Sequence, residues 1–290
     1  MKIAICAIIK NENLYLREWV EYHKRLGFDK IILYDNNPVD GEVPHQVIGD
    51  YVMDGYVDVH NIRGVPWSYR GVEGEQQRVQ ERSYTRCIKT YRNEYKWIAF
   101  IDVDEFICFG KDESRNIHDI FEKYGYDSKG FENVLMSWYV IGSDGETSYE
   151  NYPVRMRFHN HVEIRDPKYG ISDLWVKSIV RTDALNDGAF MGCHVLPKSY
   201  CCNEQAYFVP GENEGYGSPQ QIPFPSYDVI YVKHYVTKSL WEHLSKMRHL
   251  KNGFWVQDNR METYKMINGW SEESEKILQK FQEYLNNSEE

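Results

Sequence analysis

The sequence predicts an α/β protein built on a mostly parallel sheet, followed by a less regular second half and C-terminal helices. Strand patterns alternate with helix patterns through residues 1–110, as in a Rossmann-like half-domain. One apolar run, residues 97–106, contains the carboxylates of Asp102, Asp104 and Glu105 near its end, where open α/β sheets bind ligands. With 290 residues, 42% of them hydrophobic, the chain can form a sizeable core.

The first half is predicted from apolar periodicity and turn residues. Residues 2–9 are a continuous apolar strand, and residues 14–26 have apolar side chains at helical spacing up to Gly27, which we expect to end the helix. A second strand, 30–34, stops at the turn formers Asp35-Asn36-Asn37-Pro38. The other elements expected here are a strand at 56–62, a helix at 75–91 and the strand at 97–106.

The second half has shorter strands separated by loops rich in Gly, Pro, Asn and Asp, notably residues 210–225. Its periodicity predicts strands at 134–140, 154–158, 176–181 and 229–235. Residues 239–285 are mostly helical by periodicity, with breaks at Asn252-Gly253 and Asn268-Gly269. These patterns divide the chain into a domain of residues 1–238, with halves 1–110 and 111–238, and a helical extension, 239–290.

Composition narrows the class of protein. A net charge of -10 opposes general binding to nucleic acid or to an anionic membrane surface. No apolar run approaches the roughly 20 residues that span a bilayer, so we expect a cytoplasmic protein. The six cysteines have no CxxC spacing, which favours reduced thiols over a zinc site at Cys193, His194, Cys201 and Cys202.

Polar residues follow the predicted strands where a ligand is expected. No Gly-x-Gly-x-x-Gly or P-loop motif is present, which argues against dinucleotide enzymes and P-loop phosphotransferases. Lys10-Asn11-Glu12 follow the first strand instead. Asp35 ends the second strand, where it is suited to accept hydrogen bonds from a ribose or a base, or to initiate a turn.

Two residues near position 235 suit a metal and a phosphate. His234 follows an apolar strand, and a neutral imidazole can complete the coordination of a manganese ion, although a packed histidine is the alternative. Lys238 is suited to neutralise a phosphate, or to begin a helix in solvent.

Many blocks of the sequence, in order and spacing, resemble glycosyltransferase family 92 and its bacterial family 2 relatives, which have the GT-A fold. The resemblance covers about residues 2–253. Its blocks are Lys10-Asn11-Glu12, Glu18-Trp19, Tyr22-His23, Gly27, Tyr34-Asp35-Asn36, Gln80 with Tyr84 and Cys87, Asp102-Val103-Asp104-Glu105-Phe106, Trp138, Gly142-Ser143-Asp144-Gly145, Lys177-Ser178-Ile179-Val180, His194, His234-Tyr235 and Lys238-Ser239.

The resemblance implies a GT-A catalytic domain with a nucleotide-sugar half (1–110) and an acceptor half (111–238), transferring a hexose from a nucleoside diphosphate sugar. It implies that Asp104 and His234 bind the metal, that Asp102 lies at the ribose or at a metal-bound water, and that Asp35 contacts the nucleoside. The residues expected around the nucleotide are Lys10, Asn11, Glu12 and Gln80, with Lys177 and Lys238 stabilising the released diphosphate.

Inversion, which the family relatives indicate, needs a carboxylate that takes the proton of the acceptor hydroxyl. Three carboxylates of the presumed acceptor half are candidates: Asp144, Glu146 and Asp173. We favour Asp144, although an aspartate in a turn also binds its own backbone.

The function predicted from these observations is Mn²⁺- or Mg²⁺-dependent transfer of a hexose, galactose by inference from relatives, from a UDP-sugar to a glycan or lipid-linked glycan in cell-surface polysaccharide synthesis. We expect it in the cytoplasm or at the inner face of the membrane, without a transmembrane segment. One alternative is a metal-dependent phosphohydrolase or nucleotidyltransferase using Asp102 and Asp104. The other is a non-catalytic carbohydrate-binding protein that uses aromatic residues such as Trp138, Trp175 and Trp255.

Overall fold

The chain forms two compact units that interleave along the sequence. One unit comprises Met1–Trp138 and Asp173–Lys233, and the other comprises Tyr139–Ser172 and His234–Glu290. The computed structural model describes residues 1–66, 68–70, 76–110, 116–128, 132–165, 171–184, 225–249 and 259–287. The predicted division at residues 110 and 238 concerns function and stays a prediction.

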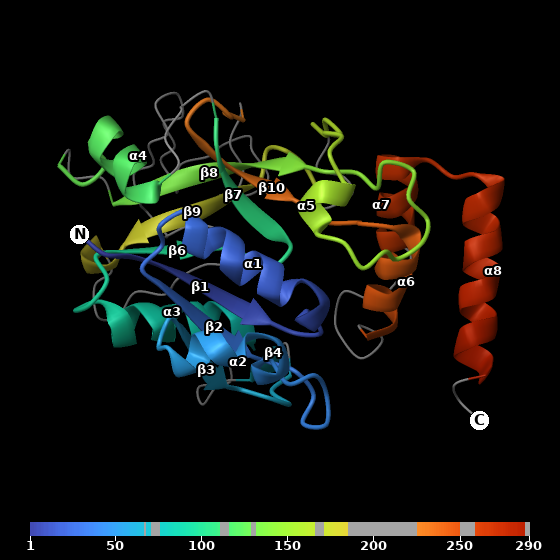
Figure 1. Ribbon diagram of the computed structural model, residues 1–290, viewed down its shortest axis with the longest axis horizontal. Coiled ribbons are helices and arrows are strands. Elements are labelled where there is room, and N and C mark those ends of the chain that lie inside the picture. The colour runs from blue at the N-terminus through green and yellow to red at the C-terminus, as the bar shows by residue number, and fades with distance from the viewer. Residues whose placement is uncertain are drawn as a thin grey trace. The chain divides into compact units, whose positions relative to one another are not determined.

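An eight-stranded sheet forms the centre of the first unit, apart from the last residues of two strands (Figure 1). Its strands are β1 (Ile3–Ile9), β2 (Lys30–Asp35), β3 (Val57–Asn61), β6 (Trp97–Phe100), β7 (Glu105–Phe109), β8 (Asn133–Val140), β9 (Val176–Arg181) and β10 (Ile230–His234). Their order in the sheet is β3-β2-β1-β6-β9-β8-β10-β7. β1 pairs in parallel with β2 and β6, and β2 with β3, whereas β9 is antiparallel to β6 and β8.

The sheet has a topological switch point between β1 and β6. The chain adds β2 and β3 on one side of β1, then returns and places β6 on the other side, with Cys6 opposite Phe100. The carboxyl ends of β1 and β6 therefore adjoin. In open α/β sheets this is where ligands bind.

Helices and a small second sheet complete the described part of the first unit. They are α1 (Asn13–Arg25), α2 (His45–Met53), β4 (Ser68–Arg70), β5 (Gln76–Arg78), α3 (Val79–Tyr91), α4 (Ile117–Tyr124) and the 3-10 turn η2 (Thr182–Ala184). α1 buries Trp19 and His23 one helical turn apart, and the Trp19 indole N–H donates to the Glu105 carbonyl at 2.8 Å. Gly27 follows α1 with a left-handed φ of 86°, as expected, and a Cβ there would overlap the Asn116 side chain that caps α4.

The core of this unit lies between α3 and the parallel strands. Tyr84, Cys87 and Ile88 of α3 pack on the sheet through residues such as Cys6 and Phe100. Each large apolar side chain buried in this way contributes about 1.5–3 kcal/mol. Cys6 and Cys87 are free thiols, and burial raises the pKa of Cys6 well above its ordinary value, so it behaves as a small hydrophobic residue.

The described helices of the second unit are α5 (Val154–Arg157), α6 (Leu240–His249), α7 (Asn259–Asn268) and α8 (Glu272–Asn287). The last three share a core of Leu240, Leu244, Tyr264, Ile277 and Phe281. α6 begins with a capping box, because the Ser239 hydroxyl accepts from the Glu242 N–H and the Glu242 carboxylate accepts from the Ser239 N–H. Arg157 ties α5 to α6 with a buried two-pronged ion pair to Glu242, at 2.7 and 2.8 Å.

The α/β prediction is confirmed, and most predicted strands lie within one or two residues of their observed positions. Residues 176–181 coincide with β9, and residues 134–140 and 229–235 overlap β8 and β10. The helical prediction for 239–285 is confirmed where the structure describes it, and α7 ends at Asn268, before Gly269. The break predicted at Asn252-Gly253 and the loop at 210–224 lie outside the described residues.

Four local predictions were wrong. Residues 97–106 form two strands, β6 and β7, joined by a turn at Asp102, and residues 154–158 form a helix in place of a strand. The helix expected from 75 begins at Val79, after β5. α2 was not predicted, because it is kinked at Ile48, its one buried residue, and so lacks an apolar stripe.

Among the helices that the structure describes, we find none whose length and hydropathy would allow it to cross a bilayer.

Histidine protonation should link the stability of the second unit to pH. His243 of α6 is 5% exposed, and burial lowers its pKa to about 4, whereas a histidine in the unfolded chain titrates near 6.5. The unfolded chain therefore binds the proton more readily, so the free energy of unfolding is highest above pH 6.5 and falls as pH drops toward 4. We expect a loss of about 2 kcal/mol between pH 7 and pH 5.

Urea denaturation at both pH values measures this loss, and the variant His243→Gln supplies the reference. Its stability should depend less on pH over this interval, because the titrating group is gone. Equal pH dependence in the two proteins would contradict the assignment.

Candidate functional site

The Asp102 carboxylate lies at the centre of a polar cluster at the carboxyl edge of the sheet, next to the switch point. Its Oδ1 accepts hydrogen bonds from Gln80 Nε2 at 3.0 Å and from the Tyr84 hydroxyl at 3.4 Å, both on α3. Its Oδ2 accepts from Lys177 Nζ on β9 at 2.7 Å. The structure thus brings together three of the predicted site residues, Gln80, Asp102 and Lys177, and adds Tyr84.

Lys177 is a buried cation between two carboxylates. Its side chain is 1% exposed, and its Nζ lies 3.4 Å from Glu105 Oε2 as well as 2.7 Å from Asp102. Glu105 is fully buried, and its Oε2 also accepts the Asp102 backbone N–H at 2.8 Å. Burial raises the pKa of Glu105, and the Lys177 ammonium at 3.4 Å opposes that rise and favours the charged carboxylate. The charges of Glu105 and Lys177 therefore depend on each other.

Asp104 follows on the same turn and is 6% exposed. The described residues contain no group of three or more His, Cys, Asp or Glu side chains arranged to hold a metal ion. A cation that also binds the phosphates of a donor needs fewer protein ligands than that, and carboxylate with imidazole is a donor set that suits Mn²⁺. The predicted ligands Asp104 and His234 are of those two types and belong to different units, so their joint binding of a cation stays a prediction.

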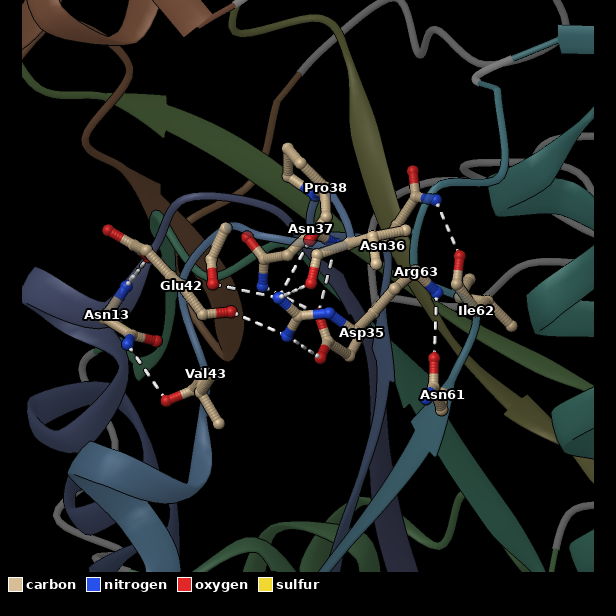
Figure 2. A network of polar contacts seen from close by, with 12 residues as sticks. Asn13, Asp35, Asn36, Asn37, Pro38, Glu42, Val43, Asn61, Ile62 and Arg63 are labelled. Atoms are coloured by element: carbon tan, nitrogen blue, oxygen red, sulfur yellow. Dashed lines mark hydrogen bonds and ion pairs between the residues drawn. The ribbon is translucent and has the colours of Figure 1, made fainter.

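The loops after β1 and β2 are joined by asparagine hydrogen bonds (Figure 2). Asn11 has a left-handed φ of 58°, and its N–H donates to Asn37 Oδ1 at 2.8 Å. Asn37 in turn donates its backbone N–H and its side-chain amide to Asp35 Oδ1, at 3.0 and 2.7 Å. Asn11 and Asp35, both predicted site residues, are therefore linked through Asn37.

Arg63, after β3, fixes the loop that follows β2 (Figure 2). Its Nη1 donates to Asp35 Oδ2 at 3.0 Å and to the Glu42 carbonyl, and its Nη2 reaches the carbonyls of Pro38, Val39 and Gly41. The ion pair is largely buried, with 14% of the Arg63 and 6% of the Asp35 side chain exposed. With Asn37 on one oxygen and Arg63 on the other, the Asp35 carboxylate has little acceptor capacity left.

The remaining residues predicted after β1 lie at the start of α1. Lys10 is exposed, and the Glu12 carbonyl accepts the N–H groups of Tyr15 and Leu16 in the first turn of the helix. Both residues thus follow β1 at the carboxyl edge of the sheet, where ligands of open α/β sheets bind.

In the second unit, two predicted segments run side by side. The Ile141 N–H donates to the His234 carbonyl at 3.0 Å, and the Leu240 N–H donates to the Glu146 carbonyl at 3.2 Å. These bonds join the turn that holds Asp144 and Glu146 to the segment from His234 to Lys238. The His234 side chain is 6% exposed and the Lys238 side chain 3% exposed.

The three base candidates differ in their surroundings. The Asp144 carboxylate accepts the backbone N–H groups of His159 and Asn160, at 2.7 and 3.1 Å, and so holds the chain that follows α5. Glu146 is exposed. Asp173, in the first unit, is fully buried.

Left-handed backbone marks the predicted segments. Among the described residues other than glycine, Asn11, Asp144 and Lys238 have φ between 53° and 58°. Such conformations cost of order 1–3 kcal/mol each and concentrate at functional sites. Each of the three belongs to a block on which the resemblance was based. His194 lies outside the described residues.

Comparison with known proteins agrees with the resemblance. The sequence profile of glycosyltransferase family 92 matches residues 2–206, more than half of the chain. The chain belongs to glycosyltransferase family 92, as predicted. Its sheet is α/β as predicted, with four neighbouring parallel strands, β3-β2-β1-β6, followed by β9, which is antiparallel to β6 and β8.

Two plant relatives give the range of similarity. A glycosyltransferase family 92 protein of Oryza sativa subsp. japonica is 26% identical over 184 residues, which cover 63% of this chain and 27% of that protein. The galactan beta-1,4-galactosyltransferase GALS2 of Arabidopsis thaliana is 32% identical over 200 residues, covering 64% of this chain and 34% of that protein. The matched region is thus about a third or less of these relatives.

A solved structure of S. aureus TarS 1-349 in complex with UDP-GlcNAc aligns over 92% of this chain and 71% of its own, with 11% identity and a TM-score of 0.44.

The Asp35–Arg63 pair should stabilise the folded state measurably. Replacing Arg63 with Met leaves the buried Asp35 carboxylate without its cation and four carbonyls without a donor, so we expect a loss of about 3–5 kcal/mol in urea denaturation. The control is Arg17→Met, because the Arg17–Asp50 pair is half exposed, so solvent screens it and its loss should destabilise the chain far less. Equal losses of unfolding free energy in the two variants would show that burial does not make the Arg63–Asp35 pair more stabilising.

Proposed function

We propose that this chain transfers a hexose, with galactose as the first candidate, from a UDP-sugar to a glycan or lipid-linked glycan acceptor. The reaction would need a divalent cation and would invert the configuration of the anomeric carbon. The observation that carries the proposal is the position of Asp102 and Asp104 at the switch point of the sheet, in a chain that belongs to glycosyltransferase family 92. The GALS2 relative, with its galactan galactosyltransferase name, supports galactose as the sugar. We place the activity in the cytoplasm or at the inner face of the membrane.

Asp104 and His234 are the residues that would hold the cation. When bound, Mn²⁺ or Mg²⁺ would neutralise the charge that develops on the diphosphate as the sugar leaves. Asp102, held at 2.7 Å by Lys177, would accept hydrogen bonds from the ribose or from a metal-bound water. Lys238 is the lysine we assign to the phosphates, since the Lys177 ammonium is already shared between two carboxylates.

The nucleoside would lie over the loops after β1 and β2. Lys10, Asn11 and Glu12 follow β1 there, and Asp35 contributes through the hydrogen bonds that order these loops. Because Arg63 and Asn37 already occupy much of Asp35, we propose that any contact between Asp35 and the base uses the remaining lone pair of Oδ2.

The base must reach an acceptor hydroxyl within hydrogen-bond distance. Exposure and existing hydrogen bonds rank the three candidates. Glu146 and Asp144 are both exposed, but the Asp144 carboxylate already binds two backbone N–H groups, and Asp173 is fully buried. We therefore propose Glu146 first and Asp144 second.

Metal dependence is tested by calorimetry with UDP. The wild-type chain should bind UDP at least about tenfold more tightly with Mn²⁺ than with a chelator, because the cation would neutralise the phosphate charge. Asp104→Ala should abolish that difference. Asp119→Ala, which removes an exposed acid of α4, is the control and should leave it intact. Equal UDP affinity with and without Mn²⁺ in the wild type would sink the metal assignment.

The donor is tested by measuring nucleotide release from a panel of UDP- and GDP-sugars in Mn²⁺. Glycosyltransferases hydrolyse their own donor slowly when no acceptor is present, so we expect release from UDP-galactose above the other donors. Glu146→Gln tests the base in the same assay once an acceptor is found, and should lower kcat by 10²–10⁴-fold. Release from a GDP-sugar alone, or phosphate release from simple esters, would contradict the proposal.

A further inference from the structure

We propose that Lys177 and Glu105 are positioning residues for Asp102: they fix its carboxylate from behind and do not themselves contact donor or metal. This inference rests on the proposed function and deepens it. It assigns different tasks to the carboxylates of the Asp102-Val103-Asp104-Glu105 run, and it moves Lys177 away from the phosphate role that the sequence suggested.

Asp102 is held at both its side chain and its main chain. Gln80 and Lys177 donate to its two carboxylate oxygens from α3 and β9, and Glu105 Oε2 accepts its backbone N–H at 2.8 Å. Three separate elements thus converge on one residue of a turn. Such restraint fixes the orientation of a carboxylate before a ligand arrives, and so lowers the cost of binding.

Exposure separates the two carboxylates that share Lys177. The Asp102 side chain is 35% exposed, whereas Glu105 is fully buried and Lys177 is 1% exposed. A ligand can therefore reach Asp102 but neither of the residues behind it. Glu105 engages the cluster through Oε2, which lies 3.4 Å from Lys177 Nζ and accepts the Asp102 N–H, and this contact makes it the counter-charge of Lys177.

The same geometry explains why Lys177 is poorly suited to bind phosphate. Its ammonium group already lies within 3.4 Å of two carboxylates, and moving it to a diphosphate would leave Glu105 charged and buried without a cation. Lys177 is therefore retained by Glu105 while a donor binds, and it keeps hold of Asp102.

The test uses four variants of the full chain: Lys177→Met, Glu105→Gln, the double variant Lys177→Met/Glu105→Gln, and Lys30→Met as control. The double variant removes one positive and one negative charge, so it should fold even where Lys177→Met alone does not. Lys30 also pairs with an aspartate, Asp58, at 2.6 Å and is 12% exposed, but it lies on β2 outside the cluster.

Calorimetry measures UDP affinity with Mn²⁺ and with chelator, and thermal unfolding reports folding. We expect the double variant to lose about tenfold or more of the gain in UDP affinity that Mn²⁺ confers, since residues that orient ligating groups have effects of this size. Its UDP affinity in chelator should stay within about twofold of wild type, and Lys30→Met should match wild type in both conditions.

A double variant that keeps the full Mn²⁺ gain overturns the inference, because Asp102 would then not need these supports. An equal loss of UDP affinity with Mn²⁺ and with chelator also overturns the inference, since general disruption of the fold gives that result. A wild-type chain without any Mn²⁺ gain is a different result: it refutes the proposed function itself.

Discussion

The hydrogen bond from a buried ammonium to the Asp102 carboxylate is the interaction on which the candidate site depends. A lysine with 1% of its side chain exposed is tolerated only where anions surround it, and Asp102 and Glu105 provide them. In return, the lysine allows several carboxylates to lie on one short turn without strong mutual repulsion. The contact between Lys177 and Asp102 therefore compensates the charge of the carboxylate and also fixes its orientation.

A second kind of restraint acts on the loops of the parallel strands. The Asn11 N–H donates to Asn37, and Asn37 donates to Asp35, which joins the ends of β1 and β2. Arg63 binds the Asp35 carboxylate and four carbonyls of the following loop. These contacts satisfy backbone carbonyls that no strand or helix pairs. The edge where a ligand is expected is therefore ordered by polar side chains, as a pre-organised site requires.

The sequence predicted the parallel strands, the position of Asp102 and Asp104 at their carboxyl ends, and the family, because these depend on local periodicity and on motif order. It did not predict the role of Arg63. The pair to Asp35 spans 28 residues and forms only because β2 and β3 are neighbours in the sheet. The split between β6 and β7 was also missed, since Val103 and Phe106 continue the apolar pattern through the turn. Likewise, no local pattern shows that Lys177 faces Asp102 from β9.

The interleaving of the two units has a consequence for synthesis and engineering. β9 lies between β6 and β8, and β10 between β8 and β7, yet the segment 139–172, which belongs to the other unit, precedes both of them in the chain. A nascent chain released as far as β8 therefore exposes the unpaired edge of β6 until residues beyond 181 emerge from the ribosome. No single cut in the chain yields either unit as a contiguous fragment. Moving the eight-stranded sheet into another protein would therefore require a permuted chain or a linker that replaces residues 139–172.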